Sequence, residues 1–267
     1  MRAQGSLLKM KSEVDKDRQV IYRLLLGETE VHINSLLGKV IKFSYTGIIH
    51  CISCGKVTRK SFAQGFCYNC MQTAPEAEDC VLRPALCRAH LGVARDMNYA
   101  REHCLKPHYV YLANTAEVKV GVTRESQIPT RWIDQGAFEA IKICKTPNRH
   151  IAGLVEQHLG SCFSDKTLWK KMLMNDINED VDLHSLRLKA LRLLTPGMFR
   201  FKCHDDSIYS FKYPVIKYPD KPQTVSFDRQ KVVEGVLLGV KGQYLLLDNN
   251  RVINLRRHSG YYVVLDY

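Results

Sequence analysis

Two pairs of cysteines constrain the fold of this chain more than any other feature of its sequence. Cys51 and Cys54 form one CxxC pair, and Cys67 and Cys70 form a second pair after twelve intervening residues. Each CxxC turn can aim two thiolates at one ion, and two such turns build the closed tetrahedral four-sulfur site that suits zinc. The alternative is a redox-active CxxC of the thioredoxin type, but that motif has a single pair within a βαβ pattern.

A second group of potential metal ligands follows in the same segment. Cys87 and His90 have the spacing of a ligand pair, and Cys80 and Cys104 can complete a site of three sulfurs and one nitrogen. His103 competes with His90 for the nitrogen position, and the alternative is a set of buried cysteines with surface histidines. We therefore expect one or two structural Zn²⁺ ions between residues 51 and 107, a stretch with too few apolar residues to fold without such a staple.

Charge and cysteine content indicate the partner and the compartment. The formal net charge is +12, spread along the chain, which favours a polyanionic partner, nucleic acid (DNA or RNA) first, over a merely soluble basic protein. No apolar run approaches the roughly 20 residues of a membrane span, and the first residues do not read as a signal peptide. We expect a cytoplasmic protein with no membrane association, in which the ten cysteines stay reduced.

The sequence predicts an α+β protein in four segments. Residues 1–50 show short apolar runs punctuated by glycine, which indicate a β-rich N-terminal segment, and residues 51–107 are the Cys/His segment. Residues 108–197 predict a small mixed α/β domain with a helical extension, and residues 198–267 a β-rich C-terminal domain. We hypothesise that the N- and C-terminal β segments complete one sheet or small barrel.

Within residues 108–197 the pattern is strand, strand, helix. Short apolar strands are predicted at 109–113 and 118–122, and a helix is expected to start near Pro129. Residues 151–159 place their apolar side chains on one helical face, and a helical tract is expected to continue to residue 194. Turns are expected at Lys241-Gly242 and Asn249-Asn250.

The order and spacing of several residues in this part resemble the GIY-YIG nuclease superfamily. The resemblance is carried by Tyr109-Val110-Tyr111, Lys119-Val120-Gly121, Arg131 and Glu156, and covers about residues 108–175. The whole chain also resembles an uncharacterised bacterial family of unknown function, through the blocks CISCGK, RWIDQGA and KGQYLLLDNNRVIN. The first resemblance implies a nuclease-like domain with a divalent-metal-dependent site.

The chemistry that these residues offer is phosphodiester cleavage. Glu156 can hold one Mg²⁺ or Mn²⁺, which prefers oxygen ligands and keeps several waters. Arg131 can contact a phosphate bidentately and take up transition-state charge, and Arg124 is the alternative. Tyr111 can relay a proton if a nearby cation lowers its pKa, and Lys119 would supply that cation. The expected catalytic residues are Tyr111, Lys119, Arg131 and Glu156.

Departures from the superfamily pattern keep other functions open. Tyr109 stands where the first motif has glycine, Lys119 where the second has tyrosine, and Gln135 where a histidine is common. The first hypothesis is an endonuclease stapled by zinc. The second is a DNA- or RNA-binding protein that kept the fold and lost catalysis. The third is a zinc-stapled interaction protein without nucleic acid, which would lack the steep salt dependence of phosphate binding.

Overall fold

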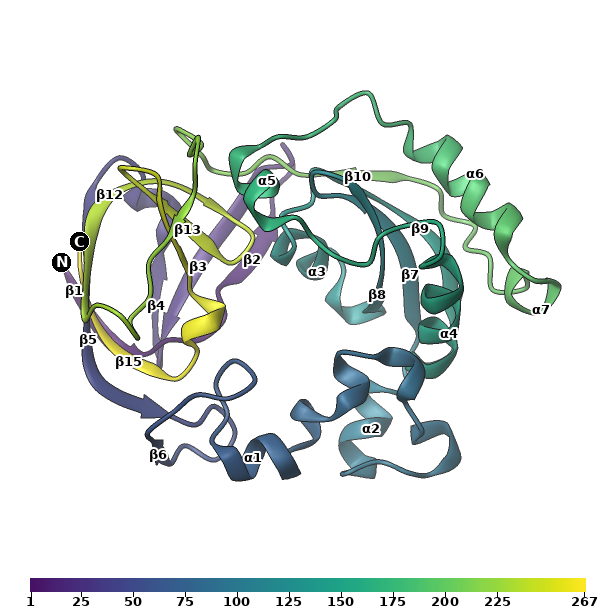
Figure 1. Cartoon of the computed structure of the whole chain (residues 1–267), viewed down its shortest axis with the longest axis horizontal. Coiled ribbons are helices and arrows are strands. Elements are labelled where there is room, and N and C mark those ends of the chain that lie inside the picture. Colours follow the sequence, from purple (N-terminus) through teal and green to yellow (C-terminus); the bar gives the residue numbers. More distant parts are fainter.

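The computed structural model describes residues 1–267 as three β-sheets with seven short α-helices (Figure 1). The mixed α+β class expected from the sequence is confirmed. The strands are β1 (Arg2–Ser6), β2 (Lys11–Val14), β3 (Val20–Leu26), β4 (Thr29–His32), β5 (Val40–His50), β6 (Val57–Thr58), β7 (His108–Asn114), β8 (Val118–Arg124), β9 (Glu139–Thr146), β10 (Ile208–Ser210), β11 (Gln223–Thr224), β12 (Val232–Lys241), β13 (Tyr244–Leu247), β14 (Arg251–Asn254) and β15 (Tyr261–Asp266). The helices are α1 (Tyr68–Thr73), α2 (Met97–His103), α3 (Thr130–Asp134), α4 (Arg149–Leu159), α5 (Trp169–Met174), α6 (Leu183–Leu193) and α7 (Pro196–Phe199).

The two ends of the chain share one sheet. Strand β1 pairs antiparallel with β15, β15 pairs with β5, and β5 pairs with β12, in the order β1-β15-β5-β12-β13-β14-β11. A second sheet, β2-β3-β4, packs beside it. Residues of β3 and β15 alternate between buried and partly exposed, as expected for strands that cover a core with one face. Both termini therefore lie together at one side of the molecule (Figure 1).

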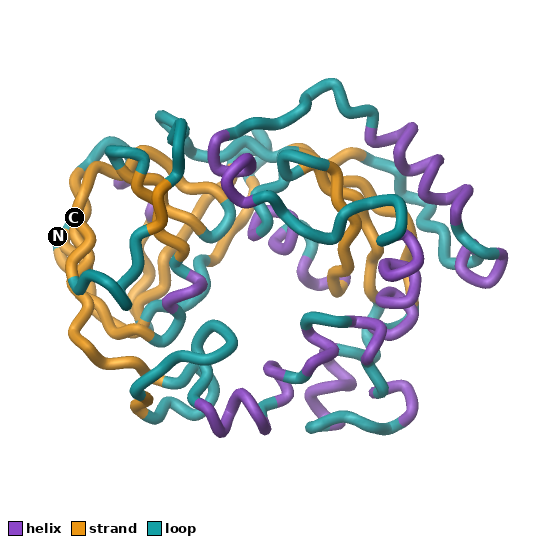
Figure 2. Tube along the Cα trace, in the orientation of Figure 1, coloured by secondary structure: helices purple, strands orange, loops and turns teal.

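The four-stranded sheet β10-β9-β7-β8 forms the other half of the molecule. Strands β7 and β8 lie within one or two residues of the strands predicted at 109–113 and 118–122, and Tyr111 pairs with Gly121 across them. Helices α4 and α6 cover this sheet, because the apolar faces of both helices join one cluster of 14 buried residues with its strands. Figure 2 shows the two groups of strands on opposite sides of the molecule.

Two features of this half differ from the sequence-based expectation. Strand β9 was not predicted, and β10, from the segment assigned to the C-terminal β domain, instead pairs with β9. The helical tract expected to run to residue 194 is broken into α5 and α6, since Asn175 adopts a left-handed conformation that ends α5. Leu194 and Thr195 separate α6 from the short helix α7, which begins at Pro196.

The two halves share a hydrophobic core. One cluster of 31 buried residues joins side chains of β1, β3, β5, β12 and β15 to Tyr111, Trp132 and Ile133 of the half that contains the four-stranded sheet. Trp132 is fully buried and packs on Tyr111, with 5.7 Å between ring centroids. Helix α3 is therefore fixed against both halves.

The Cys/His segment connects the two halves along one edge of the molecule (Figure 1). Its only cores are two small clusters, in which cysteines are prominent: Cys51, Phe66 and Ala74 in one, and Cys80, Cys87, Ala89, Ala100 and Cys104 in the other. Apart from β6, α1, α2 and short 3₁₀ turns it is irregular. Such a segment lacks the buried apolar area that would fold it alone.

Candidate functional site

Cys51, Cys54, Cys67 and Cys70 come together as a four-sulfur cluster. Their Sγ atoms all lie within 4.8 Å of one another. The Sγ atoms of Cys54 and Cys67 are 3.9 Å apart, close to the edge of about 3.8 Å of a tetrahedron with Zn–S bonds of about 2.3 Å. This donor set and spacing fit a metal such as zinc.

The tight turns of this cluster depend on local backbone geometry. Cys67 caps helix α1, and its Sγ accepts a hydrogen bond from the backbone N–H of Cys70 at 3.4 Å. Gly55, directly after the first pair, has φ of 72°, a conformation that glycine adopts without strain. The two CxxC turns are thus folded so that all four thiols face one point.

Cys80, Cys87 and Cys104 form a second group, with Sγ atoms within 4.8 Å of one another and all three side chains buried. Hydrogen bonds from Cys104 and Cys80 lower the pKa of Cys87 well below its usual value. The guanidinium of Arg149 lies 3.5 Å from the Sγ of Cys80 and offsets part of the negative charge that thiolates would bring. These three thiols can also hold a metal.

The structure does not bring His90 to this group. His90 is exposed, and its ring stacks on His150 with 4.3 Å between ring centroids. His103, the competing residue, stacks on Tyr99 at 3.8 Å and bonds the carbonyl oxygen of Tyr99 through Nδ1. The ligand spacing of Cys87 and His90 is present in the sequence, but the 3₁₀ turn between them directs the cysteine inward and the histidine outward.

The second cysteine group lies against the helix that carries Glu156. A Cβ atom on Gly153 of α4 would come within 2.1 Å of the backbone nitrogen of Ala85, so only glycine permits this approach. The backbone N–H of Arg149, the first residue of α4, donates to the carbonyl of Cys104. Folding of the Cys/His segment therefore positions α4.

Tyr111, Lys119, Arg131 and Glu156, which come from four separate elements, are brought together by the fold. Tyr111 lies on β7, Lys119 on β8, Arg131 on α3 and Glu156 on α4. The charges of Lys119 and Arg131 both act on Glu156, and those of Arg131 and Glu156 both act on Tyr111. We refer to these four residues as the central group.

The carboxyl of Glu156 is partly buried and makes no ion pair shorter than 4 Å. Burial raises its pKa to about 7, although Lys119 and Arg131 act in the opposite direction. A carboxylate held in this way gains most when a cation binds, because the cation replaces the lost hydration.

Lys119 is held by the loop that follows α4. Its Nζ donates to the carbonyl of Asp165 at 3.0 Å and to the hydroxyl of Thr167 at 3.2 Å, and the side chain is 5% exposed. Burial, followed by the charge of Arg131, lowers its pKa to about 8. The amine therefore fixes the loop that follows α4, and it also places positive charge beside Glu156.

Tyr111 does not have the lowered pKa that a proton relay would require. Its ring is fully buried, and this burial raises the pKa of the phenol despite the nearby charge of Arg131. The neutral hydroxyl instead donates a hydrogen bond to Oε1 of Gln135 at 2.8 Å. Gln135, noted in the sequence only as a departure from the superfamily pattern, is thus the direct partner of Tyr111.

Asp134 anchors helix α3, a role that sequence reasoning missed. Its carboxylate pairs with Nζ of Lys9 at 2.5 Å and accepts a hydrogen bond from Nε2 of Gln243 at 2.8 Å. Gln243 also bonds both backbone groups of Met10. No local sequence signal joins residues so far apart in the chain, but together they fix the helix that presents Arg131.

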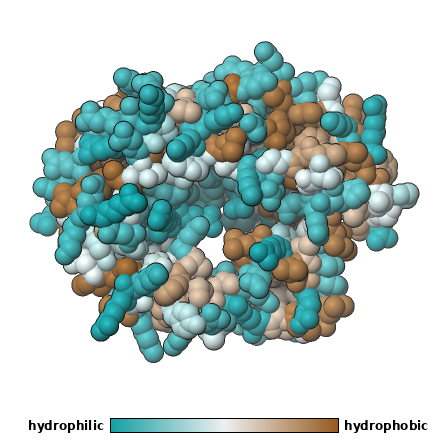
Figure 3. Space-filling model, in the orientation of Figure 1, coloured by the Kyte–Doolittle hydropathy of each residue, from teal (hydrophilic) through white to brown (hydrophobic).

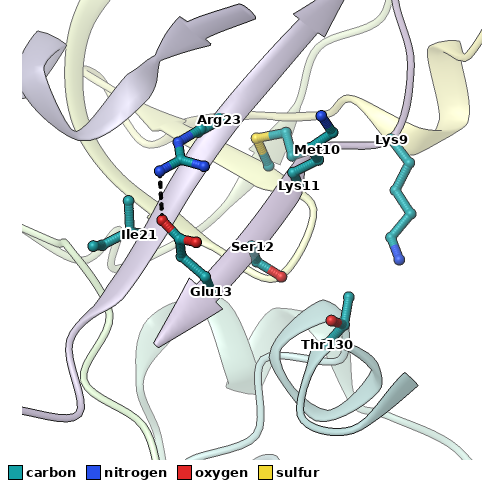
Figure 4. Close-up of a pocket in the computed structure, with 8 residues that line it drawn as sticks. All are labelled: Lys9, Met10, Lys11, Ser12, Glu13, Ile21, Arg23 and Thr130. Carbon is teal, nitrogen blue, oxygen red and sulfur yellow. Dashed lines mark hydrogen bonds and ion pairs between the residues drawn. The ribbon is translucent and has the colours of Figure 1, made fainter. Parts of the chain in front are cut away.

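A cavity of about 300 Å³ lies between the strands β2 and β3 and the start of α3 (Figure 4). Its walls are basic and acidic at once, and Arg23 pairs with Glu13 at 2.6 Å across it. Lys9 and Lys11 are paired with Asp134 and Glu30, so each cation of the lining already has a carboxylate partner. The cavity is lined by Lys9, Met10, Lys11, Ser12, Glu13, Ile21, Arg23 and Thr130.

None of the helices has the length and apolar content to cross a membrane. The geometry defines a mixed α+β protein with two cysteine clusters that can hold a metal, and with a separate central group formed by β7 and β8 of the four-stranded sheet and by α3 and α4. Residues 38–263 match the model of a family described as protein of unknown function (DUF2797), and the chain belongs to this family. No curated protein and no solved structure matches the chain.

Proposed function

We propose that this protein is a zinc-containing nucleic-acid-binding protein whose central group is a divalent-metal-dependent phosphodiesterase site of the GIY-YIG type. The observation that carries the proposal is the convergence of Tyr111, Lys119, Arg131 and Glu156 from β7, β8, α3 and α4, in the order that the resemblance implies. The net charge of +12 supports a polyanionic substrate.

Each residue of the central group has a distinct role in the proposed reaction. Glu156 is the carboxylate that holds Mg²⁺ or Mn²⁺, which when bound supplies Lewis-acid stabilisation and an activated water. Arg131 contacts the phosphate and offsets the charge that develops in the transition state. Lys119 keeps positive charge beside Glu156, and Tyr111 acts as a neutral hydrogen-bond donor that positions the substrate, since its raised pKa disfavours a relay.

Structural zinc at the two cysteine clusters completes the proposal. The four-sulfur cluster folds the start of the Cys/His segment, and the three-sulfur cluster positions α4 through Gly153 and Arg149. In this proposal zinc does not take part in the reaction. It fixes the element that carries Glu156.

The deciding experiment is cleavage of labelled single- and double-stranded DNA and RNA with Mg²⁺, Mn²⁺ or chelator, with the Glu156→Gln variant beside the wild type. Glutamine keeps the size of the side chain and removes the ionised oxygen, so the fold should persist while cleavage disappears. Equal cleavage by wild type and variant would overturn the assignment of Glu156.

The second candidate is a nucleic-acid-binding protein without catalysis. The observation in its favour is that two donors of Lys119 are already used by Asp165 and Thr167, as in a structural residue. Salt-sensitive binding without cleavage under any metal would select this candidate.

A further inference from the structure

Arg256, in the β-rich half of the chain, lies close to the central group. It begins the short 3₁₀ helix Arg256–His258 that follows β14. The backbone N–H of the preceding residue, Leu255, donates to the carbonyl of Gln243 at 2.9 Å, and the side chain of Gln243 bonds Asp134 at 2.8 Å. Asp134 is on α3, one helical turn after Arg131, so this chain of contacts places Arg256 beside that helix.

The guanidinium of Arg256 has no partner. Its side chain is partly buried, and it makes neither an ion pair nor a hydrogen bond. Arg131 likewise makes no ion pair. Asp134, the one acid whose charge acts on Arg256, is already paired with Lys9 at 2.5 Å.

A partly buried guanidinium without a partner, such as that of Arg256, is unfavourable. Burial lowers the pKa of Arg256, the charge of Arg131 acts in the same direction, and the charge of Asp134 opposes both. Partly buried charges are normally paired, because the lost hydration has to be replaced. An anion between or along the two guanidinium groups would supply that pairing, and phosphate matches their donor geometry.

The position of Arg256 indicates the direction in which a bound strand would run. The surface is hollowed at the centre of the molecule, and hydrophilic side chains border much of this hollow (Figure 3). In Figure 1 the 3₁₀ helix Arg256–His258, drawn in yellow, lies at the left of the central opening, and α3 lies at its upper edge. Arg131 and Arg256 therefore belong to the two halves that meet at the hollow.

We infer that Arg256 is a second phosphate-binding residue, so that a nucleic-acid strand held at Arg131 continues into the central hollow and contacts the β-rich half through Arg256. This inference rests on the proposed function. The ligand class is the phosphodiester backbone of DNA or RNA, which offers successive phosphates to guanidinium groups on both sides of the hollow. The role of Arg256 is in binding and is independent of the metal held by Glu156.

The test measures binding separately from cleavage. In the Glu156→Gln background, which is expected not to cut, a fluorescent single-stranded oligonucleotide is titrated by anisotropy at several salt concentrations between about 50 and 200 mM. Three proteins are compared: the background itself, the same protein with Arg256→Gln, and the same protein with Arg257→Gln. Arg257 is the matched control, because it is the adjacent residue and its side chain is exposed without an ion pair.

The Arg256→Gln variant loses one phosphate contact, so it should bind the oligonucleotide several-fold to tenfold more weakly. The slope of log affinity against log salt should fall by about 0.7 for a single strand. Arg257→Gln should bind like the background. Thermal unfolding of all three proteins checks that the fold is intact, and Arg256→Lys, which keeps the charge, should restore most of the slope. Affinity and slope equal for the Arg256 and Arg257 variants would overturn the inference.

Failure of the inference and failure of the proposed function are distinguishable. If the wild type cuts and Glu156→Gln does not, but Arg256→Gln binds normally, the catalytic proposal stands and the role of Arg256 is wrong. If no oligonucleotide binds at any salt concentration, both are wrong.

Discussion

The hydroxyl oxygen of Tyr111 lies 2.7 Å from the place that a Cβ atom on Gly121 would occupy. The two residues are directly paired across β7 and β8, so the phenol ring crosses over the glycine to reach Gln135. Gly121 is therefore required by its neighbour: any larger residue would push the hydroxyl out of the central group.

Gly121→Ala tests this relationship. The added methyl group meets Tyr111 in a fully buried place, and overpacking of this kind typically costs about 1–3 kcal/mol of unfolding free energy. Thermal unfolding and the cleavage or binding assay should both show a loss. Gly197→Ala is the control, because a Cβ atom there has no neighbour within 4 Å. Similar behaviour of the two variants would contradict the predicted constraint.

Arg131→Ala should remove charge stabilisation from the proposed site. By comparison with the loss of one oxyanion donor, we expect about 3 kcal/mol, or roughly a hundredfold, in the cleavage rate. Arg131→Lys keeps the charge but loses bidentate geometry, so its cleavage rate should fall between those of the wild type and Arg131→Ala. Arg124→Ala is the matched control, since Arg124 bonds only Ser126 through its side chain. A larger effect at Arg124 would transfer the role to that residue.

Local patterns explain what the sequence could predict. The strands β7 and β8 were recognised by short apolar runs with a turn between them, and the turns at Gly242 and Asn249-Asn250 by residues that adopt positive φ. The cysteine clusters were recognised by ligand spacing, because two CxxC turns leave few arrangements for four thiols. In each of these examples the information lies within a short stretch of chain.

Strand β9 was not predicted from the sequence, because a lysine interrupts its apolar pattern. Lys142 is 8% exposed in the middle of the strand, and its Nζ bonds Asp205 and Tyr209, each at 2.8 Å. Both partners come from the segment around β10, more than 60 residues later in the chain. A pattern within β9 cannot indicate such partners, and for the same reason the pairing of β10 with β9 had no signal in the sequence.

The direction of a side chain was equally difficult to predict. The spacing of Cys87 and His90 gives the reach of a ligand pair, but the backbone turn between them decides that one is buried and the other exposed. The anchoring of α3 by Lys9 and Gln243 depends on contacts between distant segments, for which a single sequence has no local signal.

Zinc content can be tested by elemental analysis of protein purified without added metal. We expect two equivalents in the wild type, one in Cys54→Ser and one in Cys87→Ser, because each variant loses one thiolate of a different cluster. Cys162→Ser should keep both, since Cys162 is exposed and outside the clusters. Less than half an equivalent in the wild type would rule out both sites.

Removal of metal should loosen the Cys/His segment before the sheets. The two cores of this segment consist largely of the cysteine side chains themselves, so their packing depends on the metal that the thiolates hold. Limited proteolysis with a strong chelator should cleave between residues 51 and 107 first. Simultaneous cleavage in the four-stranded sheet would instead show that the segment and the sheet unfold as one unit.

Lys241 should make the stability of the fold depend on pH in a specific direction. Its side chain is fully buried, Nζ bonds Oδ1 of Asn175 at 2.8 Å, and burial lowers its pKa to about 7. In the unfolded chain a lysine has a pKa of about 10.4. Between these values the unfolded chain binds a proton that the folded chain lacks, so the free energy of unfolding should rise with pH by up to about 1.4 kcal/mol per unit. None of this gain in the free energy of unfolding is present below pH 7, and all of it is present above pH 10.4.

Lys241→Met isolates this effect. Methionine fills a similar volume without a charge to dehydrate, so at pH 7 the variant should be more stable than the wild type, with a difference that shrinks as pH approaches 10. The rings of Tyr213 and Tyr218, each 5.3 Å from Nζ, favour the charged amine and would reduce the difference without changing its sign. Denaturant unfolding at pH 7, 8 and 9 measures it, with Lys221→Met, at an exposed position, as the control. A constant difference across this range would mean that Lys241 titrates normally in the folded protein, with its charge stabilised by Asn175 and the two rings.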